Sequence, residues 1–149
     1  MKPLSLTLKN FGPYINETID FTKFEDSSLF LISGKTGSGK TTIFDGMSYA
    51  LFGESSGKLR LGKEMRSTFA DPSEATEVTL LFKHNEYLYE LNRLPEQELF
   101  KKRGTGVRKQ SAKISLIVKD AQGKELRAYS KRREVDELIQ ELLHLNANQ

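Results

Sequence analysis

Residues 29–42 read LFLISGKTGSGKTT and contain the most specific local pattern in the chain. The apolar run that ends at Ser33 predicts a short buried strand. The segment from Gly34 to Thr41 then matches the pattern G-x-x-x-x-G-K-[ST] without a gap. Apolar residues at helical spacing follow over residues 43–51. A strand before the motif and a helix after it are the context that a phosphate-binding loop requires.

Each fixed position of the motif has a chemical reason. Its glycines let main-chain N–H groups turn toward an anionic phosphate, and the following helix adds the positive end of its dipole. We expect Lys40 to reach the β- and γ-phosphates and the Thr41 hydroxyl to ligate Mg²⁺, so the predicted cofactors are ATP and Mg²⁺. The predicted cofactor-binding residues of this loop are Gly34, Lys35, Thr36, Gly37, Ser38, Gly39, Lys40, Thr41 and Thr42.

Arg66 and Ser67 are additional candidates for the nucleotide site. They follow a connection over residues 54–63 that is rich in serine, glycine and charged residues. Two interpretations stay open for this pair: contact with the nucleotide from the side opposite the loop, or simple solvation of an exposed segment.

The composition is that of one soluble globular domain. The chain has 149 residues, of which 37% are hydrophobic and 29% are charged. No apolar run approaches the length of a membrane span, and no signal-type apolar segment follows Met1-Lys2. Cysteine is absent, which excludes disulfides and thiolate metal sites. We therefore expect a cytoplasmic protein with no membrane partner.

Charge is distributed unevenly along the chain. Residues 1–99 carry 11 basic and 14 acidic side chains, whereas residues 100–149 carry 12 basic and 6 acidic ones. A flexible basic loop without an acidic residue is expected over residues 101–110. It suits nonspecific contact with nucleic-acid phosphates, although a solubilising role is an equal alternative. The candidate nucleic-acid contacts are Lys101, Lys102, Arg103, Arg108 and Lys109.

The remaining pattern predicts an α/β fold with a mixed sheet that includes an antiparallel β-hairpin portion. Alternation of apolar and polar residues predicts strands over residues 4–11, 15–21, 76–83, 87–93 and 111–119. Gly53 is a natural C-cap for the helix after the motif. From Arg133 onward, one apolar helical face should pack on the sheet; it comprises Val135, Leu138, Ile139, Leu142 and Leu143.

The acidic half of a hydrolytic site is missing from the sequence. A P-loop hydrolase needs a second strand of four apolar residues that ends in an acidic residue. The nearest match ends at Lys119-Asp120, where a lysine interrupts the run. Because Gly123 follows closely, we interpret Asp120 as a hairpin residue. The sequence thus predicts a phosphate cradle without catalytic residues, as in a fragment of a larger protein.

Several motifs together resemble a known family. They are the opening MKPLSLTLKNFGPY, the loop followed by TTIFD, the run YALFGE at residues 49–54, and Arg66-Ser67 with Ala70-Asp71-Pro72. In this order they are similar to the N-terminal ATPase segment of the SbcC family, bacterial relatives of the Rad-fifty proteins within the SMC-like ATP-binding cassette ATPases. The resemblance covers essentially the whole chain.

The resemblance implies an incomplete head domain. Residues 1–149 would be the first lobe of a split ATP-binding cassette head, without the Q-loop, coiled coil and C-terminal lobe. The implied partners are an SbcD-type nuclease subunit, double-stranded DNA ends and a second copy of the head in an ATP-dependent homodimer. Relatives often have a basic residue after the Asn-Phe pair that approaches the nucleotide. Here Gly12 occupies that position, which leaves only backbone contacts.

Three functions therefore remain open from the sequence. The first is the ATP-binding lobe of a DNA-repair exonuclease ATPase subunit, which would hydrolyse ATP only in the complete protein. The second is a nonspecific DNA-binding module that acts through the basic loop. The third is the nucleotide-binding domain of a transporter, for which the basic loop and the Asn10-Phe11-Gly12-Pro13 opening have no evident use.

Overall fold

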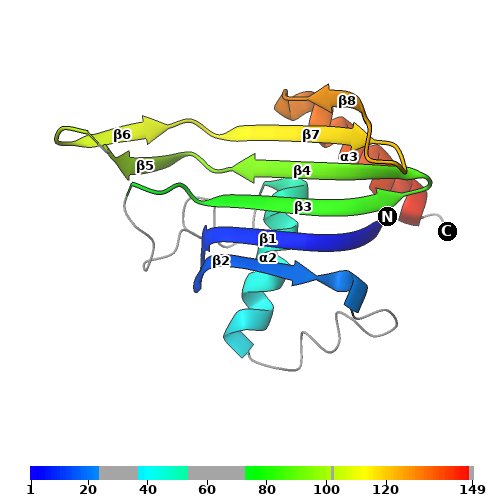
Figure 1. Cartoon of the computed structure of the whole chain (residues 1–149), viewed down its shortest axis with the longest axis horizontal. Helices are drawn as coiled ribbons and strands as arrows, with labels where there is room; N and C mark the ends of the chain where they lie inside the picture. Colours follow the sequence, from blue (N-terminus) through cyan, green and yellow to red (C-terminus); the bar gives the residue numbers. More distant parts are fainter. Residues whose placement is uncertain (24–36, 54–72, 102, 148–149) are drawn as a thin grey trace.

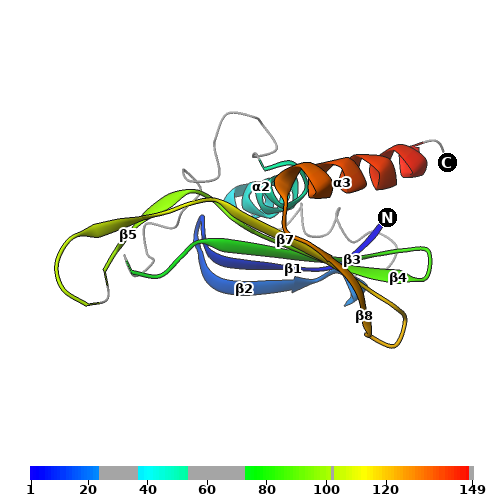
Figure 2. The ribbon, with the colours of Figure 1, turned by 90° about the horizontal axis from the view of Figure 1, so that it is seen from above.

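The computed structural model describes residues 1–23, 37–53, 73–101 and 103–147, which form a six-stranded sheet with two helices on one face (Figures 1 and 2). The strand order is β2-β1-β3-β4-β7-β8, and every described pairing is antiparallel. These strands are β1 (Lys2–Phe11), β2 (Tyr14–Asp20), β3 (Glu77–His84), β4 (Tyr87–Leu94), β7 (Lys113–Lys119) and β8 (Glu125–Tyr129). The helices are α2 (Gly37–Phe52) and α3 (Arg132–Ala147), with a short 3-10 turn η1 (Phe21–Lys23).

Most predicted elements are confirmed. The first two strands form a hairpin, β3 and β4 form a second one, and both helices lie where the periodicity placed them. Asp120 is a turn residue as predicted, because its carboxylate accepts the backbone N–H groups of Gln122 and Lys124, each at 2.9 Å. The predicted strand before the loop, over residues 29–33, lies outside the described residues. The parallel part of the expected mixed sheet depends on that strand and is therefore not described.

The flexible loop predicted over residues 101–110 is wrong in part. Val107–Gln110 forms a strand, β6, which pairs with β5 (Gln97–Phe100) in a two-stranded sheet. The pairing Leu94↔Lys113 of β4 and β7 continues in the same register as Gln97↔Gln110 of β5 and β6. One long ribbon therefore leaves the sheet, interrupted where Pro95 supplies no N–H. We call residues 97–110 the basic arm; it extends beyond the main sheet (Figures 1 and 2).

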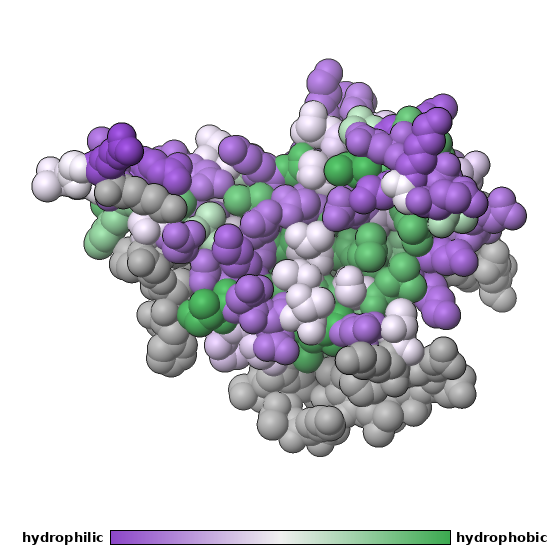
Figure 3. Space-filling view, in the orientation of Figure 1, coloured by the Kyte–Doolittle hydropathy of each residue, from purple (hydrophilic) through white to green (hydrophobic). Residues whose placement is uncertain are grey.

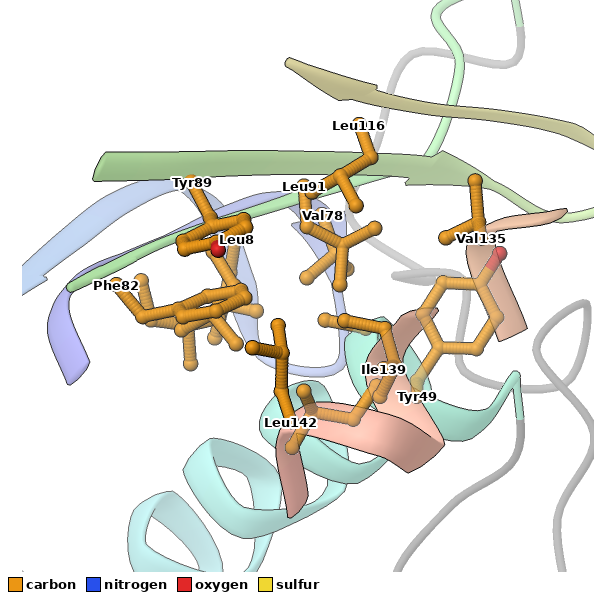
Figure 4. Packing of buried hydrophobic residues seen from close by; sticks show 14 of the residues in the cluster. Leu8, Tyr49, Val78, Phe82, Tyr89, Leu91, Leu116, Val135, Ile139 and Leu142 are labelled. Atoms are coloured by element: carbon orange, nitrogen blue, oxygen red, sulfur yellow. The ribbon is translucent and has the colours of Figure 1, made fainter. Parts of the chain in front are cut away.

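The main core fills the space between the sheet and the two helices. Its centre combines inward-facing strand residues with one face of α3, as Figure 4 shows. Val135, Ile139 and Leu142 are at most 5% exposed, which confirms the predicted apolar face of that helix. The rings of Phe82 and Tyr89 stack with their centroids 4.9 Å apart. Within the described ranges, neither helix is long and apolar enough to cross a bilayer.

The opposite face of the sheet carries short polar side chains in its middle. Thr18, Thr7, Thr79, Asn92 and Ser115 lie in one row across five strands. The Asn92 amide donates to Thr79 Oγ1 at 2.9 Å, and the hydroxyls of Thr7 and Thr18 are 3.1 Å apart. Figure 3 looks onto this face and shows hydrophobic patches beside the polar ones. Neither α2 nor α3 covers it (Figure 2).

A glycine allows α2 to approach the sheet closely. The helix runs across the strands behind β1 (Figure 1), and a Cβ built on Gly46 would lie 2.6 Å from Leu8 Cδ2 and 3.4 Å from Leu6 Cδ2. Both leucine side chains are fully buried, so neither has free space to move into. Glycine in a helix costs up to about 1 kcal/mol relative to alanine, and this contact explains why it is present.

We predict that Gly46→Leu lowers the free energy of unfolding by about 1–3 kcal/mol, because the new side chain overpacks the space that Leu8 fills. Urea denaturation measures this change. Gln140→Leu, at an exposed position of α3, should change stability by less than about 0.5 kcal/mol. Combining Gly46→Leu with Leu8→Ala should cost less than the sum of the two single changes. Strict additivity would contradict the proposed contact.

Candidate phosphate-binding site

The predicted phosphate-binding motif leads into the N-terminus of α2. The helix begins at Gly37, inside the motif, and continues for 16 residues. The amides of a first helical turn have no partner within the helix, and the helix dipole favours an anion there. No acidic residue lies in this first turn to compete with a phosphate. The described backbone therefore fits a bound phosphate group at this end of α2.

Part of the predicted site lies outside the described residues. For the first turn of α2 the backbone is described and the side chains are not, so contacts of Lys40 and Thr41 with phosphate or Mg²⁺ stay predictions. Among the described side chains, no cluster of three histidine, aspartate or glutamate residues is suited to hold a metal ion. The predicted residues that lie entirely outside the described ranges are Gly34, Lys35, Thr36, Arg66 and Ser67.

The turn between β1 and β2 presses against Thr42. Thr42 is 6% exposed, and a Cβ built on Gly12 would lie 2.7 Å from Thr42 Cγ2. Gly12 also has a φ of 57°, in the left-handed region that favours glycine. Phe11, the preceding residue, is fully buried with its ring centroid 6.1 Å from that of Tyr49 on α2. The opening Asn-Phe-Gly-Pro motif thus positions the first turns of the helix.

A buried polar network fixes this turn to the base of the basic arm. Asn10, with a φ of 52°, donates from Nδ2 to the Ala75 carbonyl at 2.9 Å, and its own carbonyl accepts the Thr76 hydroxyl at 2.8 Å. The Gln97 amide in turn accepts the Thr76 N–H at 2.8 Å and donates to the Thr76 carbonyl at 3.2 Å. Sequence reasoning missed Thr76 and Gln97, because a single polar residue in a strand pattern gives no sign of a buried partner.

Arg93 holds the opposite end of α2. Its Nε donates to the Ala50 carbonyl at 3.1 Å, its Nη2 lies 3.5 Å from Asp136 of α3, and its guanidinium lies 5.9 Å from the centre of the Tyr49 ring. Burial lowers the pKa of Arg93 and raises the pKa of Tyr49 well above its usual value. Gly53 ends the helix with a φ of 81°, and its N–H donates to the Tyr49 carbonyl at 2.7 Å, as expected for a C-cap.

A cavity of about 350 Å³ also lies at this C-terminal end of α2. Its lining includes Arg93, Lys113 and Arg132. The phosphate-binding motif lies at the other end of the same helix. The cavity is therefore distinct from the predicted nucleotide site.

The candidate nucleic-acid contacts lie on the basic arm, apart from Lys102, which is outside the described residues. Lys101, Arg103, Arg108 and Lys109 are all exposed. Lys109 pairs with Glu96 at 2.8 Å, and this hydrogen bond raises the pKa of the lysine. The structure therefore groups the predicted cations on one element, in a hairpin rather than a wholly irregular loop.

We predict that Gly12→Ala weakens binding of MgATP several-fold, because the added Cβ displaces Thr42 at the start of α2. Isothermal titration calorimetry measures the affinity. Gly123→Ala is a matched control: Gly123 has a φ of 87°, but no atom lies within 4 Å of a Cβ built there. Both changes should carry the cost of a left-handed alanine, about 1–2 kcal/mol, and only Gly12→Ala should change the affinity.

Removal of the opposing methyl group provides the decisive comparison. Thr42→Ser deletes Cγ2 and keeps the hydroxyl, so the pair Gly12→Ala with Thr42→Ser should recover most of the lost affinity. An affinity that stays low in the pair, or a loss that Gly123→Ala reproduces, would contradict a steric link between Gly12 and Thr42.

Comparison with known proteins adds a family and several relatives. A family model described as an AAA domain matches residues 5–148. The C subunit of nuclease SbcCD from Lactococcus lactis is 47% identical over 153 aligned residues, and the protein of the same name from Vibrio cholerae is 43% identical over 150. Each alignment covers 100% of this chain but only 14% and 15% of the relative. A Staphylococcus aureus protein of that name is 54% identical over 93 residues, which is 62% of this chain and 9% of that protein.

Proposed function

Because the chain belongs to the AAA domain family, we propose that it is the MgATP-binding lobe of an ATPase subunit in an SbcCD-type nuclease. The relatives named above support this choice over a transporter domain, and they match the resemblance found in the opening motif, the loop and the YALFGE run. We also propose that residues 1–149 form an ATP-binding cassette-type first lobe of a split head.

One observation carries the proposal. A 16-residue helix begins inside the G-x-x-x-x-G-K-[ST] motif, and the β1–β2 turn at Gly12 holds the second turn of this helix at Thr42. Lys40 would hold the β- and γ-phosphates, and Thr41 would hold Mg²⁺, which when bound neutralises phosphate charge. Thr42 would be the next donor, toward the α-phosphate.

The chain spans 14–15% of the length of the two relatives that match all of it. We propose that the whole protein is a cytoplasmic repair enzyme that acts at double-stranded DNA ends. In it, two heads would close on ATP, and an SbcD-type nuclease subunit would be the partner. The sequence places no acidic residue after a run of four apolar residues, so we propose that this chain alone binds ATP without appreciable turnover.

We predict that Lys40→Ala weakens MgATP binding by about 10-fold to 100-fold, as expected for the loss of charged hydrogen bonds worth about 1.5–3 kcal/mol. Calorimetry on this chain measures the change. Lys35→Ala removes the same charge from a variable position of the motif and should have a much smaller effect. Equal losses in the two variants, or no heat with the unaltered chain, would reject the site. Robust turnover that Lys40→Ala abolishes would reject the proposed inactivity of the isolated chain.

A second candidate function is nonspecific DNA binding through the basic arm. The observation that favours it is the exposed hairpin that carries Lys101, Arg103 and Arg108, none of which has a described ion pair. Salt-sensitive contact with phosphates is the behaviour expected of such cations.

We predict that changing these three residues to glutamine lowers the slope of log affinity against log salt by up to about 2.7, because each phosphate contact on duplex DNA contributes about 0.9. Fluorescence anisotropy with a labelled duplex at several salt concentrations measures the slope. The same change at three exposed lysines elsewhere, Lys83, Lys124 and Lys131, should alter it much less. An unchanged slope in the arm variant would exclude the arm as the contact.

A further inference from the structure

The basic arm ends in an exposed apolar pair. Phe100 is 56% exposed and Val107 is 46% exposed, and the two residues lie directly opposite each other across β5 and β6. Along β5 the exposure alternates, with Gln97 and Leu99 buried and Glu98 and Phe100 exposed. Opposite residues of an antiparallel pair point to the same side, so Phe100 and Val107 form one small apolar surface on the exposed side of the hairpin.

The backbone beyond this pair is ordered by a further hydrogen bond. The N–H of Lys101 donates to the Gly106 carbonyl at 3.0 Å, one step past the Phe100–Val107 pair. Gly104 and Gly106 have φ values of 81° and 104°, which allow the chain to reverse here. The aromatic ring is therefore mounted on a paired strand, which lowers the entropy lost when a ligand contacts it.

Cations flank the apolar pair along the chain. Lys101 follows Phe100 directly, Arg108 follows Val107, and Arg103 lies in the connecting turn; all three are exposed. The nearest acidic residue, Glu98, lies two residues before Phe100 on the same exposed side, opposite Lys109, which pairs with Glu96. The sequence has no acidic residue between Leu99 and Lys119. In Figure 3 the tip of the arm is pale, and hydrophilic residues lie just behind it.

This combination favours a nucleic acid over a protein as the occupant. Stable protein interfaces bury about 800 Å² on each partner, far more than two side chains provide, and they are poor in lysine. An aromatic face beside exposed cations matches the stacking platforms that bind single-stranded nucleic acid. Inside a duplex, neighbouring base pairs cover each base, so only an unpaired or terminal base has a free face.

We propose that Phe100, supported by Val107, stacks on an unpaired or terminal base of DNA while Lys101, Arg103 and Arg108 contact the adjacent phosphates. The arm then distinguishes frayed ends and single strands from the continuous duplex. This inference rests on the proposed function, in which the protein acts at DNA ends, and it adds the ligand feature that the arm recognises.

The test compares Phe100→Ala with Tyr87→Ala in this chain. Tyr87 is 44% exposed and follows the β3–β4 turn, at the end of the main sheet away from the arm (Figure 1). The probes are a single-stranded oligonucleotide, a duplex with splayed ends, and a duplex of the same length capped at both ends by stilbene linkers, which stack on the terminal base pairs and add no unpaired base. We expect Phe100→Ala to weaken binding to the first two probes by about 10-fold, the loss of one stacked base. Binding to the capped duplex and the salt slope should not change, and Tyr87→Ala should match the unaltered chain.

A base analogue gives an independent readout of stacking. The fluorescence of 2-aminopurine in the splayed end should be quenched on binding to the unaltered chain and not on binding to Phe100→Ala. Equal loss on open and capped probes, no loss on any probe, or unchanged quenching would each overturn the inference. No loss on any probe would instead favour a protein as the partner of Phe100. MgATP binding should be the same in Phe100→Ala, so failure of the stacking proposal and failure of the ATP site are separate results.

Discussion

The contact of α2 with the sheet is the constraint on which the rest of the structure depends. The helix is held at three points: Thr42 against Gly12, Gly46 against Leu8, and the Ala50 carbonyl against Arg93. Two of these contacts are possible only because glycine has no Cβ. Together they leave the helix little freedom to slide or rotate on the strands, because packed interiors do not deform continuously.

This constraint matters most at the start of the helix. A phosphate site made of backbone amides is only as precise as the position of the helix that supplies them. The β1–β2 turn lies beside the second turn of α2, and its own geometry depends on residues with positive φ, Asn10 and Gly12. The far end of the helix depends on a buried guanidinium that also reaches α3 through Asp136. The two ends of α2 are thus fixed by different parts of the fold.

Elements with strong local patterns could be predicted from the sequence. The motif, the helix after it, the two hairpins and the apolar face of α3 each follow from periodicity or from turn residues over a short stretch. Strands β5, β6 and β8 were missed because QELF, VRKQ and ELRAY are only four or five residues long. Their pairing depends on the neighbouring strand more than on their own residues. The strand order could not be predicted, because it depends on contacts between segments far apart in the chain.

The candidate site shows the same division. The phosphate-binding motif can be recognised from the sequence alone, since each of its fixed residues has a role in binding the ligand. Gly46 is not evident, because a glycine within a helical pattern looks like a weakness until the facing Leu8 is known. Gln97 is not evident either, since its buried partner Thr76 lies 21 residues away in the sequence. Residues that act on the fold rather than on a ligand leave little trace in a single sequence.

The double hydrogen bond of Gln97 to Thr76 has a mechanical consequence. It ties the root of the basic arm to Thr76, whose hydroxyl also donates to the Asn10 carbonyl beside the β1–β2 turn. From Gln97 the paired strands extend roughly 10 Å to Phe100, at about 3.3 Å per residue. A rotation of the hairpin about this root would move Phe100 farther than it moves Gln97, in proportion to that length.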